Sequence, residues 1–531
     1  MITLLDYGAG NVRSVRNAIT KLGYSVQDVD SPADILNAER LIFPGVGSYG
    51  SVMERLHRDG FVGPLIERIK SNKPVLGICV ALQALFEGSE ESPGVAGLSI
   101  LKGQVKRFPG SSLSVPQIGW NGVNLHKESS LFSGYNDEKL YFVHSYCALL
   151  EDRDKEWLLT TTNYGREFVS GVQKGNIAAF QFHPEKSGAA GLNLLGNYLK
   201  SDANESIVLS SSRVVEKQCE TRIARRVVAC LDVRANDNGD LVVTKGDQYD
   251  VRDKGEVRNL GKPVELAKRY YEEGADEITF LNITGFRDFP MQDQPMLEVL
   301  QKTSEQVFVP LTIGGGIREF TDSNGRQYTS LDVASEYFRS GADKISIGSD
   351  ACYAAEEYLR TGKKSAKSSI EQISMVYGAQ AVVISVDPRR VYVRSPDETD
   401  HNCIETTVPG PDGEKYCWYQ CTVKGGREGR DLDAVQLASS CEALGAGEIL
   451  LNCIDKDGTN SGFDFELINH VKSAVTIPVI ASSGAGSAAH FVEVFRETGA
   501  EAALAAGIFH RREVPIAEVK EALFQAGIEV R

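Results

Sequence analysis

The sequence has a deficit of positive charge and no long apolar run. Its 531 residues include 57 Lys and Arg against 72 Asp and Glu, which gives a net charge of −15. This balance argues against nucleic acid or a membrane surface as a partner. No apolar run reaches membrane-spanning length, and the chain enters an apolar strand at residues 2–5 without a visible signal or transit peptide. We therefore expect a cytoplasmic protein.

The sequence also lacks the clustered ligands of a metal site. The nearest of its ten cysteines, Cys417 and Cys421, have no second pair and no histidine at the spacing of a zinc site. Reduced thiols in a cytosolic protein are the simplest account of such scattered cysteines. Asp457 and Gly458 resemble the start of a calcium loop, but Asn460 stands where that loop requires glycine. We expect neither a metal nor a cofactor.

One cysteine lies where a nucleophile is expected. Cys79 follows an apolar strand, residues 74–78, and precedes a helix-forming stretch, residues 81–86. At a helix N-terminus the backbone N–H groups and the helix dipole favour the thiolate. A nucleophile also needs a base and a group that orients the base, and His183 and Glu185 of a His-Pro-Glu motif supply both. Alone, the cysteine and the histidine would be ordinary core residues, but together they favour catalysis.

The pattern along the chain predicts an α/β protein of two domains. Short apolar strands alternate with amphipathic helices and glycine-rich turns throughout. Residues 203–221 are rich in Ser, Glu and Lys, and we interpret them as a linker between domains at 1–202 and 222–531. Residues 394–430 interrupt the second domain and predict an insertion, in the form of a β-hairpin that carries residues 416–419.

The second domain contains an internal repeat. Residues 310–316 parallel residues 478–484, and each half has four strand signals, each followed by a helical stretch. Two such halves predict an eight-stranded (β/α)8 barrel with its active site at the C-terminal ends of the strands. Asp232 and Asp387 end corresponding strands and are expected to face each other across the mouth. They would otherwise cap helices or turns, but the symmetric positions favour catalysis.

Glycine-rich turns lie half a repeat apart, at residues 314–316 and 483–486. Such turns let backbone N–H groups converge on a phosphate, often at a helix N-terminus. Two of them in symmetric positions predict a substrate with a phosphate at each end. The residues expected at these phosphate sites are Gly315, Gly316, Gly348, Ser349, Gly484, Ala506 and Gly507, together with Lys245, Asp457 and Gly458.

Four charged residues occupy the starts of barrel strands, namely Arg226, Glu277, Lys344 and Glu448. Arg226 has the same parity as Asp232, so a regular strand points both side chains into the barrel. These four residues either form a structural ring of salt bridges at the barrel floor or gate an opening into the barrel. The sequence leaves both alternatives open.

Both halves of the chain resemble known families. Residues 1 to about 200 resemble a triad (class I) glutamine amidotransferase domain, in the Cys79 elbow, in the His-Pro-Glu motif and in residues 6–11, 44–50, 118–121 and 141–146. Residues 222–531 resemble the cyclase half of imidazole glycerol phosphate synthase, in residues 229–232, 242–246, 314–317, 455–459 and 481–486. The order of the halves resembles the fused, eukaryotic form of that family. The resemblance implies a glutamine amidotransferase α/β domain joined to a TIM barrel.

The resemblance also implies a reaction. Cys79 would attack the carboxamide of glutamine, with His183 as acid and base and Glu185 as its orienter. Ammonia would pass through the barrel to a bisphosphorylated ribotide, and Asp232 and Asp387 would share the acid–base steps of cyclisation. The partners are therefore small molecules, and because both domains share one chain we expect a monomer.

Further residues of the first site follow from the same resemblance. Gly45, Val46 and Gly47 are suited to presenting backbone N–H groups to an oxyanion, and Gln83 would contact the bound glutamine. Ala81 stands where the family has glycine, and its methyl group is expected to crowd the elbow.

Two rival functions have distinct signatures. A related phosphosugar isomerase shares the half-barrel symmetry, but an attached glutaminase would serve no purpose there. A binding protein with a decayed glutaminase, with Ala81 as the first sign, would lose glutamine-dependent activity and keep ammonium-dependent activity.

Overall fold

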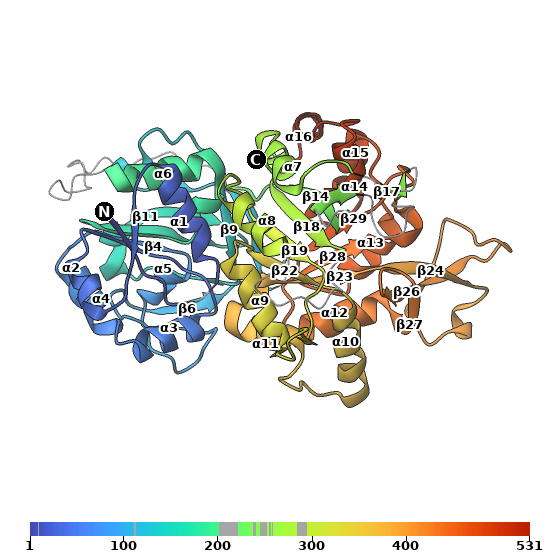
Figure 1. Ribbon diagram of the computed structural model, residues 1–531, viewed down its shortest axis with the longest axis horizontal. Helices are drawn as coiled ribbons and strands as arrows, with labels where there is room; N and C mark the ends of the chain where they lie inside the picture. The colour runs from blue at the N-terminus through green and yellow to red at the C-terminus, as the bar shows by residue number, and fades with distance from the viewer. Residues whose placement is uncertain are drawn as a thin grey trace.

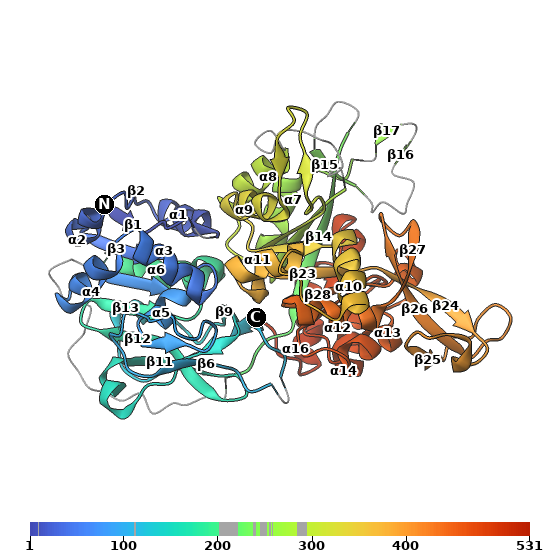
Figure 2. The same cartoon turned by 90° about the horizontal axis from the view of Figure 1, so that it is seen from below.

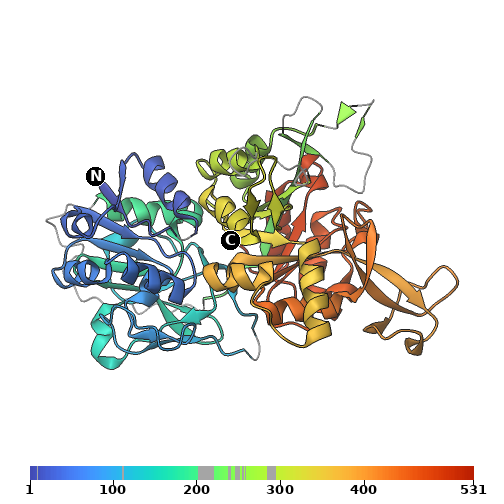
Figure 3. The same ribbon diagram turned by 60° about the horizontal axis from the view of Figure 1, so that its bottom comes forward.

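The computed structural model describes residues 1–531 except 9, 111–112, 201–220, 237–240, 245–251, 254–255, 258 and 284–294. The predicted linker, apart from Thr221, and Lys245 therefore lie outside the described residues. Two lobes lie side by side, the N-terminal domain and the barrel (Figure 1), and views from other directions keep them apart (Figures 2 and 3). No helix in the described part of the chain is long and apolar enough to cross a membrane.

The N-terminal domain is built on a mixed eight-stranded sheet. Its strands, in spatial order, are β2 (Val26–Asp28), β1 (Ile2–Leu4), β3 (Arg40–Phe43), β4 (Val75–Ile78), β13 (Ile177–Phe180), β12 (Glu167–Lys174), β11 (Leu158–Asn163) and β8 (Asn124–Leu125). The first five are parallel and the last three antiparallel. Smaller strands are β5 (Gly88–Ser89), β6 (Gln104–Arg107), β7 (Gln117–Asn121), β9 (Leu140–His144) and β10 (Tyr146–Cys147).

Helices cover both faces of this sheet. They are α1 (Val12–Lys21), α2 (Pro32–Asn37), α3 (Tyr49–Arg58), α4 (Val62–Lys70), α5 (Val80–Ala84) and α6 (Gly188–Lys200). Successive strand residues enter different cores: Leu41 and Phe43 pack on the side of α3 and α4, and Ile42 on the side of α1 and α6. This alternation follows from the period of two in a strand, and burial on both faces explains why the central strands are apolar throughout.

The second domain is a closed parallel barrel. Its strands are β14 (Arg226–Ala235), β18 (Glu277–Asn282), β19 (Leu311–Gly314), β22 (Lys344–Ile347), β23 (Val382–Val386), β28 (Glu448–Asn452), β29 (Val479–Ser482) and β30 (Ala502–Ala505), and β14 pairs with β30 to close it. β15 (Leu241–Thr244) extends β14 as an antiparallel neighbour. The predicted α/β fold with an eight-stranded barrel is confirmed.

The barrel strands alternate between the interior and the surrounding helices. Val228 and Cys230 belong to a small apolar cluster inside the barrel, and Val227 and Ala229 to the large core outside it. The helices are α7 (Pro263–Glu272), α8 (Pro295–Ser304), α9 (Ser330–Arg339), α10 (Ser349–Thr361), α11 (Ser369–Tyr377), α12 (Ala434–Leu444), α13 (Phe465–Lys472), α14 (Ala488–Glu497), α15 (Gly507–His510) and α16 (Ile516–Gln525). β16 (Arg252–Asp253) pairs antiparallel with β17 (Glu256–Val257), and β20 (Phe320–Thr321) pairs antiparallel with β21 (Gln327–Tyr328).

The insertion differs from the simple hairpin that we expected. It is an antiparallel sheet of β24 (Pro388–Val393), β25 (Cys403–Glu405), β26 (Tyr416–Val423) and β27 (Glu428–Asp433), and it projects from the side of the barrel away from the N-terminal domain (Figure 1). Its strands extend beyond residues 394–430 on both sides. β26 is long enough to pair with all three other strands, and this pairing lets a Pro-, Gly- and charge-rich segment form a sheet.

The N-terminal domain contacts the barrel at the N-terminal ends of the barrel strands. The Trp120 indole N–H donates to the carbonyl of Asp276 at 3.2 Å, just before β18. The C-terminal Arg531 guanidinium lies 4.2 Å from the Trp120 ring centroid and donates to the Asp276 carboxylate at 2.9 Å. Lys186 pairs with Asp343, just before β22, at 2.7 Å. Contacts from several elements thus fix the first domain on the barrel floor.

Candidate active sites

Cys79 lies on a strained turn between β4 and α5. Its φ of 52° and ψ of −108° are unusual for a residue with a side chain, and such strain persists only where packing imposes it. The packing is tight on the neighbouring loop, because a Cβ at Gly45 would lie 1.7 Å from the Ile78 carbonyl oxygen and 2.4 Å from the Val80 nitrogen. The backbone of Gly45 therefore lies directly against the elbow.

His183, the predicted base, lies beside Glu185, its predicted orienter. The Nδ1 of His183 lies 2.8 Å from Glu185 Oε1, and because a carboxylate only accepts, Nδ1 carries the proton. Burial by itself would lower the pKa of His183, but the charges of Cys79 and Glu185 raise it well above its ordinary value. Nearby His144 behaves differently, because burial lowers its pKa to about 3 and keeps it neutral. His183 is therefore the histidine that can hold a proton beside the thiol.

Two glutamines connect the elbow to its surroundings. The Gln181 amide donates to Cys79 Sγ at 3.4 Å, and Gln83 donates to Gln181 Oε1 at 3.1 Å and to the Tyr146 carbonyl at 3.1 Å. Gln83 is thus buried and hydrogen-bonded one turn beyond the thiol. Sequence reasoning missed Gln181, although its position two residues before His183, on the same side of an extended segment, was a usable signal.

The Gly45–Gly47 loop is held by a buried tyrosine. The Tyr7 hydroxyl donates toward the carbonyls of Pro44 at 2.9 Å and Val46 at 3.1 Å, and it accepts from the Val46 N–H at 3.2 Å. The pKa of Tyr7 is raised by burial, so its hydroxyl stays protonated. The Val46 N–H is therefore occupied by Tyr7 and does not point freely toward an incoming carbonyl.

The methyl group of Ala81 occupies space that Gly77 leaves. Ala81 is buried, and a Cβ at Gly77 would lie 3.3 Å from the Ala81 Cβ. Because Gly77 has no side chain, the helix still packs close to β4. Gly77 therefore leaves room for the Ala81 methyl group, and the predicted effect of Ala81 on activity stays a prediction.

At the barrel mouth, one cavity of about 570 Å³ contains both predicted acids, Asp232 and Asp387. Asn452 donates to Asp387 Oδ1 at 2.8 Å and Ser385 to Oδ2 at 3.2 Å. Burial raises the pKa of Asp387 above its ordinary value in spite of these bonds, and the charge of Asp457 raises it further. A carboxyl with a raised pKa is suited to both giving and taking a proton.

The predicted phosphate turns flank these acids. Gly315 has φ of 89° and Gly484 has φ of 96°, and a Cβ at either position would lie 2.2 Å from the carbonyl oxygen of Asn282 or Gly462, respectively. Only glycine fits such an approach. The mouth cavity is lined by Gly315, Gly316, Gly348, Ser349, Asp457 and Ala506, and an adjoining hollow of about 360 Å³ by Asp457, Gly458, Gly484, Ala506 and Gly507. α10 begins at Ser349 and α15 at Gly507, so each half contributes a helix start.

The four charged residues at the strand starts form a closed ring. Arg226 pairs with Glu277 at 2.8 Å and with Glu448, and Lys344 pairs with each glutamate at 2.6 Å. All four side chains are at most 1% exposed. Burial would raise the pKa of Glu277, but Lys344 and Arg226 lower it below its ordinary value. Alternating charges thus neutralise each other across the barrel floor.

Apolar side chains from five of the strands line one side of the interior between this ring and the mouth. They come from β14, β23, β28, β29 and β30, namely Val228, Cys230, Val383, Leu450, Ile480, Ala502 and Leu504. Tyr141 of β9 lies close enough to the ring for Glu277 to raise the pKa of its hydroxyl, in addition to the effect of burial. The N-terminal domain therefore covers the outer side of the ring.

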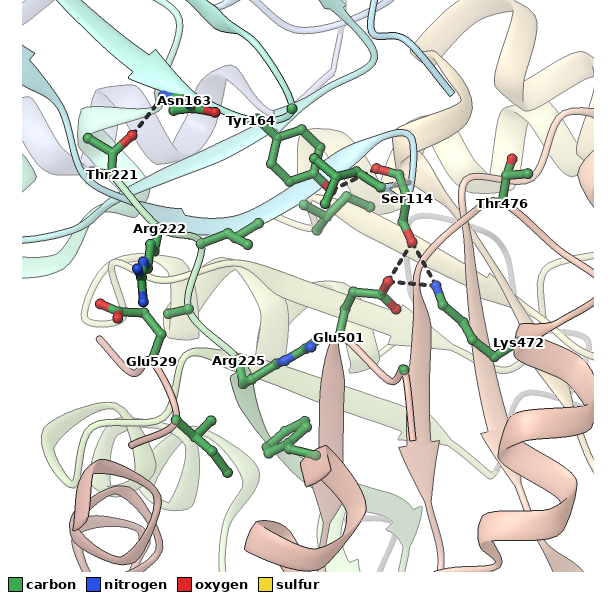
Figure 4. Close-up of a pocket in the computed structure, with 18 of the residues that line it drawn as sticks. Ser114, Asn163, Tyr164, Thr221, Arg222, Arg225, Lys472, Thr476, Glu501 and Glu529 are labelled. Carbon is green, nitrogen blue, oxygen red and sulfur yellow. Dashed lines mark hydrogen bonds and ion pairs between the residues drawn. The ribbon is translucent and has the colours of Figure 1, made fainter. Parts of the chain in front are cut away.

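A further cavity of about 870 Å³ lies between the two domains (Figure 4) and contains none of the predicted catalytic residues. Its polar residues contact one another: Lys472 pairs with Glu501 and donates to Ser114, each at 2.6 Å, and the Tyr164 hydroxyl donates to the Ser114 carbonyl at 2.7 Å. This cluster ties residues before β7 to the barrel.

Within the described residues, no group of three or more His, Cys, Asp or Glu is arranged to hold a metal ion.

Two family models match the chain. The model described as "Glutamine amidotransferase class-I" matches residues 3–200, and the model described as "Histidine biosynthesis protein" matches residues 226–515. Each match falls on one of the two domains.

Several characterised relatives are similar over the full length. "Imidazole glycerol phosphate synthase hisHF, chloroplastic" of Arabidopsis thaliana is 58% identical over 100% of this chain and 89% of its own. The hisHF synthase of Emericella nidulans is 56% identical over 100% of this chain and 98% of its own. The hisHF synthase of Schizosaccharomyces pombe is 54% identical over 100% of both chains.

Proposed function

Because the chain belongs to the bifunctional imidazole glycerol phosphate synthases of histidine biosynthesis, we propose that its two sites divide one reaction. Glutamine hydrolysed at Cys79 supplies ammonia. The barrel combines this ammonia with a phosphoribulosyl-formimino-aminoimidazole-carboxamide ribotide, and the products are imidazole glycerol phosphate, an aminoimidazole carboxamide ribotide and glutamate. The observation that carries the proposal is the assembled Cys79, His183 and Glu185 triad in a domain that covers the barrel floor.

The triad supports a thioester route. The Cys79 thiolate attacks the carboxamide carbon of glutamine, and His183 gives its proton to the departing ammonia. Neutral His183 then takes a proton from water as the water attacks the thioester, which releases glutamate and restores the thiol. Glu185 keeps the imidazole in one tautomer through its 2.8 Å contact. Removing this carboxylate would leave the ring free to turn.

The oxyanion that forms in this step needs hydrogen-bond donors, and we infer that the Val46 N–H is one of them. In the structure this N–H donates to the Tyr7 hydroxyl. Ligand in the barrel would therefore have to favour an arrangement in which the peptide is released. Such coupling would prevent wasteful hydrolysis of glutamine and would be worth ~1–3 kcal/mol.

In the barrel, Asp232 and Asp387 act as the acid–base pair for imine formation, bond cleavage and ring closure. The raised pKa of Asp387 supports proton exchange at a higher pH than an exposed aspartate would allow. The two glycine-rich turns and the starts of α10 and α15 would hold the phosphates through backbone N–H groups. Lys245 would add charge, and it lies outside the described residues.

Ammonia would reach the mouth through the barrel interior. The ring of Arg226, Glu277, Lys344 and Glu448 closes the floor and has to open for passage. Beyond it, the apolar side chains of β14, β23, β28, β29 and β30 favour uncharged ammonia over ammonium. The isomerase alternative gives no role to this covered floor.

One assay tests the proposal. Product formation is measured with glutamine and, separately, with ammonium at high concentration. We expect both nitrogen sources to give imidazole glycerol phosphate. Synthesis from ammonium alone would instead indicate a decayed glutaminase, and no synthesis from either source would contradict the cyclase assignment.

We also propose that the chain acts as a cytoplasmic monomer. The contacts between its two domains, including Lys186–Asp343 and Lys472–Ser114, supply within one chain the pairing that two subunits would otherwise provide. Light scattering at working concentration tests the monomer, and cell fractionation tests the compartment.

A further inference from the structure

The turn between β26 and β27 extends from the insertion into the mouth of the barrel. Thr422, Lys424 and Gly425 line the cavity that contains the two catalytic acids. Thr422 donates to the Asp387 carbonyl through its N–H at 3.1 Å and through its hydroxyl at 2.7 Å. The Lys424 N–H donates to Ser349 Oγ at 3.1 Å. The turn is therefore fixed to the ends of two barrel strands, one of which leads into a predicted phosphate site.

The backbone at this turn indicates that the lysine is present for its side chain. Lys424 has φ of 55°, followed by Gly425 at 68° and Gly426 at 82°. A residue with a Cβ is disfavoured in this left-handed region, and glycine adopts it without cost. A lysine held there between tight anchors is the kind of local strain that clusters at ligand sites.

The mouth cavity has more carboxylates than cations, so binding of a doubly phosphorylated anion there requires a positive side chain. An anion with two phosphates entering this space meets more carboxylates than cations, so backbone N–H groups have to be supplemented by positive side chains. Among the described lining residues, the carboxylates are Asp232, Asp350, Asp387 and Asp457, and the cations are Arg318 and Lys424.

The ion pair that Lys424 makes is easily exchanged. Its ammonium contacts Glu428 at 2.7 Å, and the two side chains are 62% and 40% exposed, so solvent screens the pair. Glu428 also pairs with Arg430 at 3.0 Å, and Arg430 is held by both oxygens of Glu356 on α10, each at 2.8 Å. Glu428 therefore keeps a partner when Lys424 turns toward another anion.

We propose that Lys424 is a substrate-binding residue that contacts the phosphate held at Gly348 and Ser349. The insertion thereby contributes directly to the cyclase site. This assignment rests on the proposed function, because it assumes a ligand with a phosphate at each end. The same chemistry would hold one of the two products, since each product carries one of the two phosphates.

Product inhibition of ammonium-driven synthesis tests this assignment. In Lys424→Met, inhibition by one product should weaken about tenfold, the usual size for the loss of one charge-assisted contact, and inhibition by the other product should be unchanged. Lys424→Arg should restore most of the affinity. The matched control is Lys302→Met, which removes the lysine of an exposed i,i+4 pair with Glu298 on α8, and it should change neither constant.

Other results would overturn the assignment. Equal weakening of inhibition by both products would mean that Lys424 contributes only to the overall electrostatic potential of the cavity. No weakening for either product means that the lysine serves only to pair with Glu428. Glu428→Gln separates these roles further. If Lys424 binds phosphate, its release from Glu428 should strengthen inhibition by the same single product. If the pair is purely structural, Lys424→Met and Glu428→Gln should both lower the melting temperature and leave product binding unchanged. Failure of both products to inhibit the wild-type chain would instead contradict the proposed function.

Discussion

At the scale of single residues, the reactivity that we propose for Cys79 would come from its neighbours. Its strained backbone places the thiol at the start of α5, and His183 and Gln181 approach it from the end of β13. Cys147, another buried cysteine of the same domain, has a different setting. Burial raises the pKa of Cys147 to about 11, so that thiol stays protonated at neutral pH.

Cys79→Ala should abolish glutamine-dependent synthesis and leave ammonium-dependent synthesis near the wild-type rate, because the cyclase site is separate. His183→Ala should give the same pattern. Cys147→Ala is the matched control, since it removes a buried thiol from the same domain and should leave both activities intact. Loss of both activities in a folded Cys79→Ala chain would contradict the two-site assignment.

Asp387→Asn keeps the size of the side chain and removes the group that exchanges protons. We expect ammonium-driven synthesis to fall by ~10²–10⁴-fold, the usual contribution of a general acid or base. Because burial raises the pKa of Asp387, its protonated form persists to higher pH than for an exposed aspartate. The acidic limb of the wild-type pH–rate profile should therefore lie at higher pH than the pKa of an exposed aspartate would give. Near-normal turnover of Asp387→Asn, measured beside Asp232→Asn, would remove Asp387 from the mechanism.

Tyr7→Phe removes the hydroxyl that occupies the Val46 N–H. Glutaminase activity without barrel ligand should rise about fivefold, which corresponds to one neutral hydrogen bond of ~1 kcal/mol, and the stimulation by ligand should fall by the same factor. Tyr198→Phe is the control, because Tyr198 is also buried and donates to a backbone carbonyl, that of Leu41, at 3.0 Å. Its loss should lower stability without raising basal activity. An unchanged or lower basal rate in Tyr7→Phe would show that the tyrosine does not restrain the loop.

At the scale of secondary-structure elements, the barrel strands carry different chemistry at their two ends. Their starts carry the ring of charges, the middles of β14, β23, β28, β29 and β30 are apolar, and the strand ends carry the predicted acids and glycine-rich turns. β14 contains all three parts, with Arg226, Val228 and Asp232 pointing inward in turn. A period of two in one strand therefore connects the floor to the mouth.

Lys344→Met leaves Glu277 and Glu448 with Arg226 as their common partner. If the ring gates ammonia, less of it should reach the mouth, and the ratio of glutamate formed to imidazole product should rise above one. Ammonium-driven synthesis should be much less affected. A purely structural ring predicts a ratio of one together with a loss of ~3 kcal/mol in stability, the cost of breaking a buried pair. Measuring the ratio and the melting temperature for Lys344→Met and Arg226→Ala separates the two roles.

At the scale of the whole molecule, the glutaminase triad and the barrel ring meet across one interface. Lys186 follows Glu185 directly, and its partner Asp343 directly precedes Lys344 of the ring. Asn11 also donates to Asp343 at 2.7 Å. A movement of either domain at this contact would therefore be transmitted to Glu185 of the triad and to Lys344 of the ring, each of which is the neighbouring residue along the chain.

Lys186→Met should weaken the coupling between the two sites. We expect the barrel ligand to stimulate glutaminase less, by a factor that corresponds to a loss of ~1–3 kcal/mol of coupling free energy. Ammonium-driven synthesis should persist. Asp343→Asn and the double variant complete a cycle that isolates the pair from general destabilisation. Lys472→Met breaks a different contact between the domains, with Ser114, and is the control for docking alone. Equal loss of coupling in both lysine variants would show that docking, and not this particular pair, carries the effect.

The sequence by itself determined those features that repeat locally or recur as motifs. Strand parity predicted that Arg226 and Asp232 share the barrel interior, and the internal repeat predicted the eight strands. Contacts between residues distant in sequence were decided only by the tertiary structure: Tyr7 on Val46, Gln181 on Cys79, Lys186 on Asp343, and the pairing of β26 that turns an expected hairpin into a sheet. The physical reason is that periodicity records which face of an element is buried, whereas the partner it meets depends on how all the elements pack together.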